Sequence, residues 1–141
     1  MTEEDIKNKN LVLISYLDSI IDGYKVKAEY STNDKDIQVI VVQETSGQKV
    51  VFYEANPLYN YYNIDVYGDD IKNAKETSVI IGNLIGNNIY FDYVVGHGQH
   101  QEIQKWQIMF KQFANPRTIF YDDIRRIAYT STLQCIVNRI A

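Results

Sequence analysis

The two histidines of the chain, His97 and His100, come nearest to a metal site in type and spacing. Histidines three positions apart can bind one zinc ion when further ligands converge on it, and together with Asp92 they would suit a small metal-dependent hydrolase. However, His97 stands between two glycines, in a turn where exposed histidines are common. The single cysteine, Cys135, lies in a strand-like run, which favours a buried apolar thiol. We therefore predict no metal and no other cofactor.

Two carboxylate pairs, Asp69-Asp70 and Asp122-Asp123, are the other candidates for chemistry. Paired acids can bind Mg²⁺ or act as acid and base. The first pair precedes a helical pattern, where acids cap backbone N–H groups, and the second pair stands at an expected turn. The segment 82–86 begins and ends with glycine, but it is not followed by the Lys-Ser/Thr pair that ends a phosphate-binding loop. No nucleophile elbow or zinc-protease motif occurs either, so we predict a non-enzymatic protein and keep the hydrolase as the alternative.

Basic residues are concentrated near the end of the chain. From Ile103 onward only Asp122 and Asp123 oppose a set of six basic residues: Lys105, Lys111, Arg117, Arg125, Arg126 and Arg139. Residues 1–102 carry about twice as many acids as lysines. An acidic body with a basic arm suggests electrostatic attraction to another subunit or to an acidic partner. A solvated strand face would have the same composition and stays open as an interpretation.

Tyrosine is unusually frequent, with twelve in the chain. Tyr59, Tyr61 and Tyr62 cluster after a proline, and Tyr90 and Tyr93 lie together further on. Tyrosine combines a large contact area with a polar tip, which suits subunit interfaces. It also stacks on single-stranded bases, but an acidic body disfavours a phosphate backbone. We therefore favour a protein interface over a nucleic-acid interface.

The hydrophobic pattern predicts an α+β fold. Apolar residues at helical spacing predict helices over 4–22 and 71–85, and β-branched or aromatic runs predict the strands 37–44, 50–54, 61–67, 89–95, 101–113, 117–121 and 125–139. We expect a mixed, mainly antiparallel sheet, both helices packed on one face, and a long C-terminal β-hairpin arm. The 141 residues, 45% of them apolar, fit a single domain over residues 1–141. No apolar run is long enough to span a bilayer, and the single cysteine fits a reducing compartment.

This order of elements resembles that of the tail terminator proteins of long-tailed bacteriophages, also described as minor capsid or tail completion proteins. The resemblance covers nearly the whole chain. It is carried by four features in particular: the strand 61–70 that enters the helix 71–85, the strand Trp106–Phe110, the pair Pro116-Arg117, and the run from Arg125 to Val137. The bias towards Ile, Asn, Tyr and Lys fits a phage of a low-GC bacterial host.

The resemblance implies a virion protein that assembles in the bacterial cytoplasm as a ring, a hexamer in this family. One face of the ring would cap the tail tube and the other would join the neck or head–tail connector, while DNA passes through the lumen without specific binding. We expect the arm to add to the sheet edge of a neighbour. The expected contact residues are Arg117, Tyr121, Arg125, Arg126, Tyr59, Tyr61 and Tyr62. A neck ring of related fold and a host-factor-binding immunity or anti-defence protein are the remaining alternatives.

Overall fold

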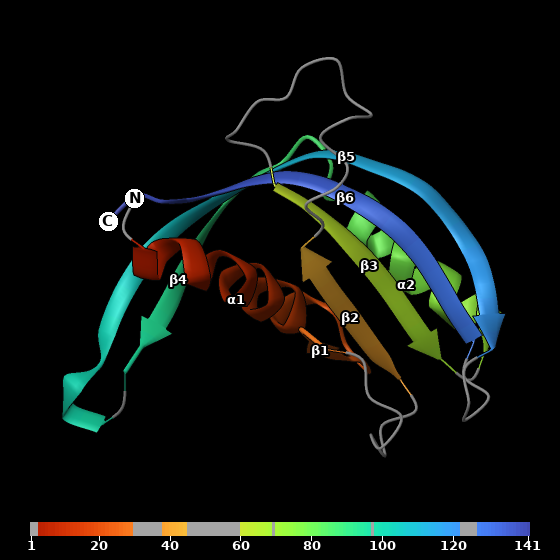
Figure 1. The fold of residues 1–141 in the computed structure, drawn as a ribbon, viewed down its shortest axis with the longest axis horizontal. Coiled ribbons are helices and arrows are strands. Elements are labelled where there is room, and N and C mark those ends of the chain that lie inside the picture. Colours follow the sequence, from red (N-terminus) through yellow and green to blue (C-terminus); the bar gives the residue numbers. More distant parts are fainter. Residues whose placement is uncertain (1–2, 30–37, 45–59, 69, 97, 122–126) are drawn as a thin grey trace.

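The computed structural model describes residues 3–29, 38–44, 60–68, 70–96, 98–121 and 127–141. These residues form two helices and a six-stranded sheet, which confirms the predicted α+β fold (Figure 1). Along the chain the elements are α1 (Glu3–Ile20), β1 (Lys25–Lys27), β2 (Val39–Glu44), β3 (Asn60–Gly68), α2 (Ile71–Gly82), β4 (Asn88–Val95), the 3-10 turn η2 (Gly98–His100), β5 (Glu102–Tyr121) and β6 (Ile127–Arg139). Among the described residues, neither helix is long and apolar enough to cross a membrane.

Both helices begin and end close to the predicted positions. In α1, Leu13 and Leu17 lie on one helical face and are fully buried, and Gly23 follows the helix with a positive φ of 80°. Asp70 caps α2, since its carboxylate accepts a hydrogen bond from the Lys72 N–H at 2.9 Å. Helix α2 ends at Gly82, three residues earlier than the predicted 71–85.

The strand order of the sheet is β1-β2-β3-β6-β5-β4. All neighbouring strands are antiparallel except β1 and β2, which run parallel. The sequence pattern missed β1 because it has only three residues. The predicted partner strand 50–54 lies outside the described residues; β2 pairs instead with β1 on one side and β3 on the other.

The long C-terminal hairpin is confirmed, but it does not project as a free arm. The predicted strands 101–113 and 117–121 form one strand, β5, and β6 pairs with it from Ile127 to Arg139. On its other side, β6 pairs with β3 from Ile127 to Cys135. Strand β6 is therefore a central strand of the sheet.

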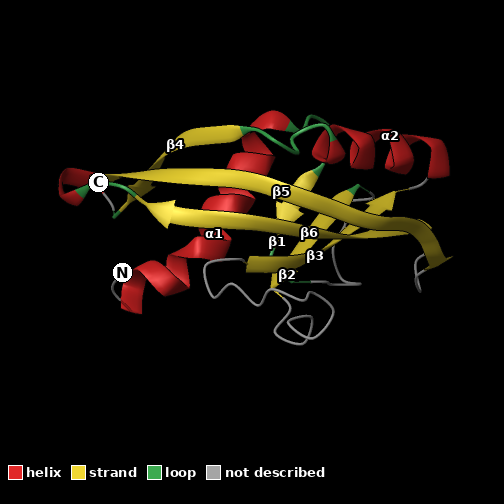
Figure 2. Ribbon diagram, turned by 90° about the horizontal axis from the view of Figure 1, so that it is seen from above, coloured by secondary structure: helices red, strands yellow, loops and turns green. Residues whose placement is uncertain are grey.

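The main core lies between the sheet and both helices, which pack on the same face. Its largest fully buried side chains are Trp106, Tyr62 and Phe110, and residues of both helices belong to the same cluster. Figure 2 shows β5 and β6 crossing over α1, with α2 beside the other end of the sheet. A smaller buried cluster lies on the opposite face and consists of Val39, Val41, Tyr67 and Ala128.

Candidate interaction surface

The β4–β5 hairpin is the part of the molecule that projects. Strand β4 pairs with the first eight residues of β5 in one unbroken register, from Val95 opposite Glu102 to Asn88 opposite Met109. This hairpin extends past the end of β3 and carries η2 at its tip (Figure 1). The turn depends on Gly96, which has a φ of 95° and whose added Cβ would lie 2.4 Å from the His100 carbonyl oxygen.

Helix α1 supports the inner face of this hairpin. The Tyr16 ring meets the Phe91 ring edge-on, with 5.6 Å between the ring centroids. Trp106, directly opposite Phe91, is fully buried and donates its indole N–H to Gln104 Oε1 at 3.1 Å. The base of the hairpin is thus part of the main core.

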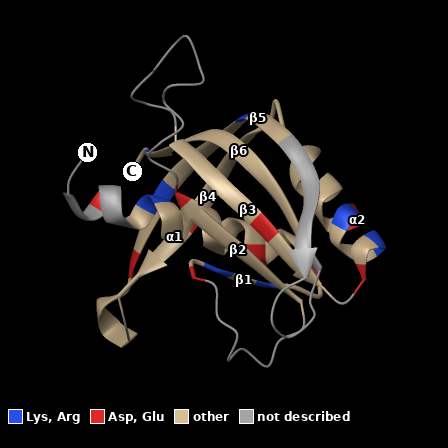
Figure 3. Ribbon diagram, turned by 45° about the vertical axis from the view of Figure 1, so that its right-hand side comes forward, with Lys and Arg blue, Asp and Glu red and all other residues tan. Residues whose placement is uncertain are grey.

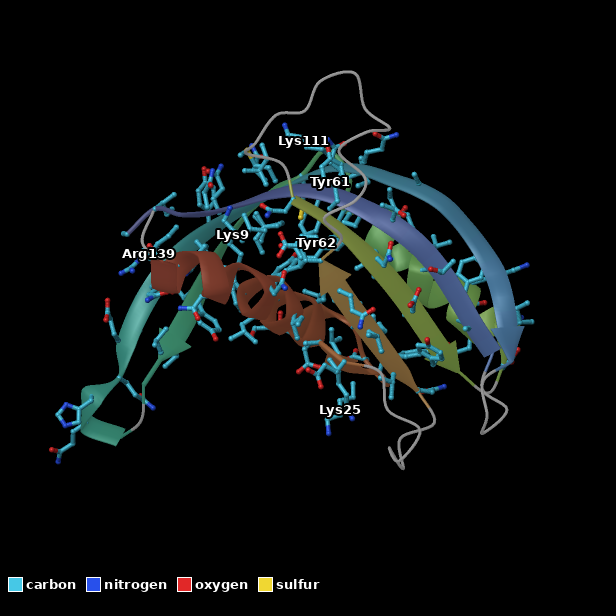
Figure 4. The ribbon with its side chains drawn as sticks, in the orientation of Figure 1. Lys9, Lys25, Tyr61, Tyr62, Lys111 and Arg139 are labelled. Atoms are coloured by element: carbon cyan, nitrogen blue, oxygen red, sulfur yellow. The ribbon has the colours of Figure 1, made fainter. Side chains whose placement is uncertain are left out.

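An ion-pair cluster fixes the start of α1 to the end of β6. The Arg139 guanidinium donates to Asp5 Oδ1 at 3.0 Å and to Glu102 Oε1 at 3.2 Å (Figure 4). Asp5 is only 5% exposed, and its pairing with Arg139 offsets part of the cost of burying the carboxylate. Hydrogen bonding to Asp5 raises the pKa of Arg139 above its usual range, against a smaller opposing effect of burial. The cluster therefore holds hairpin, helix and β6 in one unit.

Within the described ranges no strand pairs with the outer edge of β4, which we call the open edge. Strand β4 is last in the sheet order, and below it Phe110 N–H donates to Asn87 O at 3.2 Å while Gly86 N–H donates to Phe110 O at 2.9 Å. Ladder bonds alternate along an antiparallel pair. The register therefore directs outward the backbone N–H and C=O groups of four residues: Asn88, Tyr90, Asp92 and Val94.

These same four residues have exposed side chains, and two of them are apolar. Tyr90 is 70% exposed and Val94 is 52% exposed, while Ile103, directly opposite Val94 on β5, is 60% exposed. By strand alternation the three side chains share the face of the hairpin that points away from α1. We call Tyr90, Val94 and Ile103 the hairpin face.

The other two edges of the described sheet are protected. On β1 the outward Val26 N–H donates to Asp18 Oδ1 at 3.4 Å. Beyond Phe110, β5 has no strand of the described residues on its outer side, but its register shifts at three places and Pro116 lies within it. Bulges, prolines and short strands are the usual means of blocking strand addition. Strand β4 has none of these features, so it is the edge suited to a partner.

A second apolar surface lies at the C-terminal end of α2, where residues 83–87 separate the helix from the start of β4. A cavity of about 190 Å³ opens there, lined by Ser78, Val79, Gly82, Asn83, Phe113 and Tyr129. Val79 is 58% exposed, and the adjacent Ile80 is 45% exposed. A Cβ on Gly82 would lie 3.3 Å from Phe113 Cδ2, so glycine allows α2 to approach β5 beside the cavity. We call this cavity the α2 pocket.

The predicted contact residues are placed differently from what we expected. Tyr61 and Tyr62 lie in β3 and are 3% and 0% exposed, and Tyr61 Oη accepts a hydrogen bond from Gln134 at 3.2 Å (Figure 4). They belong to the sheet itself and present no surface to a neighbour in this conformation. Tyr59, Arg125 and Arg126 lie outside the described residues. Arg117 and Tyr121 belong to the backbone of β5, but their side chains are not described.

The sequence analysis missed the hairpin face. It grouped Tyr90 with Tyr93 as aromatic, yet Tyr93 packs on the core while Tyr90 faces solvent. The signal in the sequence was the alternation of residues 89–95, which carries apolar side chains on both sides of the strand.

Of the residues considered for chemistry, Asp92 and His100 lie in the β4–β5 hairpin. Asp92 lies in β4, three positions before Val95, and His100 lies in η2 at the tip. His97 and the pair Asp122-Asp123 fall outside the described residues. Within the described ranges, no three residues of the His, Cys, Asp and Glu types gather as a metal-binding group. Cys135 is fully buried, and burial raises the pKa of its thiol.

No protein-family model matches this chain, and no curated protein matches its sequence.

Proposed function

We propose that this chain is a structural virion protein of a long-tailed bacteriophage that forms a ring, caps the tail tube and joins it to the neck. The single observation that supports assembly most directly is the open β4 edge, whose outward residues include the exposed Tyr90 and Val94. A regular, apolar edge strand without bulge or proline invites association. In an assembly, that edge and the hairpin face are covered.

The identity of the assembly rests on the resemblance in element order. A helix leads into a sheet, a strand ending at Gly68 enters a second helix, and a long hairpin closes the sheet, as in tail terminator proteins. The fold supports this layout without selecting one ring over another. Arg117, Arg125, Arg126 and Tyr121 remain our proposed contacts with a neighbouring subunit or another partner.

The charge fits a ring through which DNA passes without being held. The net charge of the chain is −4, and affinity for duplex DNA depends mainly on neutralising phosphates with basic residues. An acidic ring therefore repels the DNA weakly and lets it slide. We expect no measurable duplex binding by the assembled protein at physiological salt.

The experiment has two parts, a mass measurement and a tube-binding assay. We expect native mass spectrometry over a hundredfold concentration range to show a closed oligomer, and electron microscopy to show it on one end of purified tail tubes. A chain that stays monomeric throughout and does not bind tubes would refute the proposal. Binding to isolated connector rings without any binding to tubes would instead identify a neck ring.

A further inference from the structure

We propose that two copies of the free chain pair antiparallel along their open edges, with the Tyr90 residues of the two copies directly opposite each other. The outward backbone N–H and C=O groups of the open edge meet no strand of the described ranges. These groups recur at every second residue, and an extended backbone presents donors and acceptors at the same spacing. The chemistry of the edge therefore specifies a polypeptide strand as its occupant.

The open edge is complementary to itself. In an antiparallel pair of identical strands, the numbers of facing residues have a constant sum, and the outward residues of β4 are all even-numbered. A two-fold axis at Tyr90, Phe91, Asp92 or Tyr93 therefore sets outward groups against outward groups and pairs more than half of the strand. In each of these registers the sheets of the two copies become continuous, and the helices of both copies lie on the same face.

Asp92 is the only charged residue of β4 (Figure 3), and it selects one of these registers. An axis at Asp92 sets the two carboxylates against each other, and like charges directly opposite destabilise a strand pair. An axis one residue away on either side sets Asp92 against the ring of Tyr90 or the aliphatic Val94. An axis at Tyr90 sets Asp92 against Asn88, whose amide donates to a carboxylate. Lys105 faces Asp92 from β5 in every register and does not distinguish them.

The same register pairs apolar side chains on both faces of the sheet. On the outer face the two Tyr90 rings lie opposite each other, and each is 70% exposed in the single chain. On the inner face Ile89 of one copy meets Phe91 of the other, and both side chains are partly buried against the main core. Aromatic–aromatic and aromatic–β-branched neighbours stabilise cross-strand pairs. Pairing in this register thus extends the core of one copy towards that of the other.

This inference goes beyond the proposed ring, because it concerns the chain before assembly. A contact of one patch with itself closes at two copies, whereas a ring with two different faces requires contacts between different patches. The pairing is short, with about six backbone hydrogen bonds, and contacts smaller than a standard interface are transient. The dimer therefore protects the edge from aggregation and releases it when the chain joins a ring.

Disulfide formation between cysteine variants measures the register directly. Asn88→Cys and Asp92→Cys are prepared separately, mixed and oxidised. Facing residues of a hydrogen-bonded pair have Cα atoms about 5.5 Å apart, within the range of about 4.4–6.8 Å that a disulfide spans. We expect disulfide dimers in the mixture and in neither variant alone, because Asn88 of each copy faces Asp92 of the other. Cys135 is buried and does not react in the folded protein.

Other patterns of disulfides overturn the inference. A dimer of Asp92→Cys alone would place the axis at Asp92, and a dimer between Tyr90→Cys and Asp92→Cys would place it at Phe91. No disulfide in any mixture would show that the edges do not meet. Leu11→Cys is the control, since its site is 45% exposed on α1 outside the edge. Disulfides of Leu11→Cys at a similar yield would show unspecific collision.

Sedimentation equilibrium gives the size of the effect. We expect a monomer–dimer equilibrium at concentrations below those at which the ring forms. Tyr90→Lys should raise the dissociation constant of the dimer at least roughly fivefold, because it replaces an aromatic pair by two like charges. Leu11→Lys adds the same charge outside the edge and should change the constant by less than about twofold. Equal effects of the two substitutions would contradict pairing at Tyr90.

The dimer and the ring can fail separately. A chain that dimerises in this register but never binds tail tubes would refute the ring and leave the dimer. A chain that forms closed oligomers on tubes but is monomeric when free would refute the dimer and leave the ring.

Discussion

The two halves of β5 differ in what lies on their outer side, the side away from β6. Its first half is covered by β4, a regular strand that leaves an open, partly apolar edge. Its second half has no described neighbour on that flank but carries three register shifts and Pro116. Strand β4 therefore leaves a regular edge of the kind that permits strand addition, whereas the second half of β5 carries features that oppose it.

The largest effect is expected where the hairpin joins the core. Trp106→Ala removes a fully buried ring on the inner face and should lower the free energy of unfolding by about 3–5 kcal/mol. Ile103→Ser, on the outer face three residues earlier, should change it by less than about 0.5 kcal/mol. Chemical denaturation of both variants measures the difference, and similar losses would mean that the outer face is also core.

The edge itself can be tested with proline at adjacent positions of β4. In Asp92→Pro the lost N–H points outward, so we expect a folded chain whose assembly is weakened, because the edge is covered in the proposed ring. In Phe91→Pro the lost N–H belongs to the ladder with β5, so we expect the hairpin to open. Circular dichroism and native mass spectrometry separate these outcomes, and full assembly by Asp92→Pro would show that the edge stays uncovered.

A smaller loss is expected at the tip of the hairpin. Gly96→Ala places a side chain at a φ of 95° and brings its Cβ to 2.4 Å from the His100 carbonyl oxygen. Strain of this kind costs about 1–3 kcal/mol. Hydrogen exchange should show faster opening only at the end of β4 and the start of β5, next to the turn. Gly98→Ala is the informative control, since a Cβ there meets nothing within 4 Å although φ is also positive.

The smallest effect concerns Asp65, a half-buried acid in β3. Burial raises the pKa of Asp65 above its ordinary value, although the hydrogen bond from Thr130 lowers it. The folded state therefore binds its proton more tightly than the unfolded state, and this group's contribution to stability declines as pH rises from the unfolded pKa through the folded one. Asp65→Asn should raise the melting temperature at pH 7 and lose that advantage near pH 3. Asp22→Asn, an exposed acid, should show neither change.

Local pattern predicted most elements, because helical spacing and strand alternation are properties of neighbouring residues. The pattern located α1, β3, β4 and β6 to within three residues. It missed the pairing of β3 with β6, since partners some seventy residues apart are selected by packing of the whole sheet. For this reason the prediction that the C-terminal hairpin extends as a free arm was wrong: β6 pairs with β3 as well as with β5.

The interaction surface was harder to predict than the fold. Tyr62 and Tyr90 are the same residue type in similar strand runs, yet one is 0% and the other 70% exposed. The difference depends on which face of the sheet the helices cover, and no local pattern contains that information. The exposure of each tyrosine therefore follows from the packing of the helices and could not be predicted from the local sequence.

The contact of Arg139 with Asp5 has a consequence for the order of events in folding. It joins residues 134 positions apart, so it closes nearly the whole described chain into one loop. Contacts of such long range lose the most chain entropy on closure and generally form late. We therefore expect Arg139→Gln to accelerate unfolding while leaving the folding rate almost unchanged, as stopped-flow mixing can measure. On this view the ion pair prolongs the lifetime of the folded chain by slowing its unfolding.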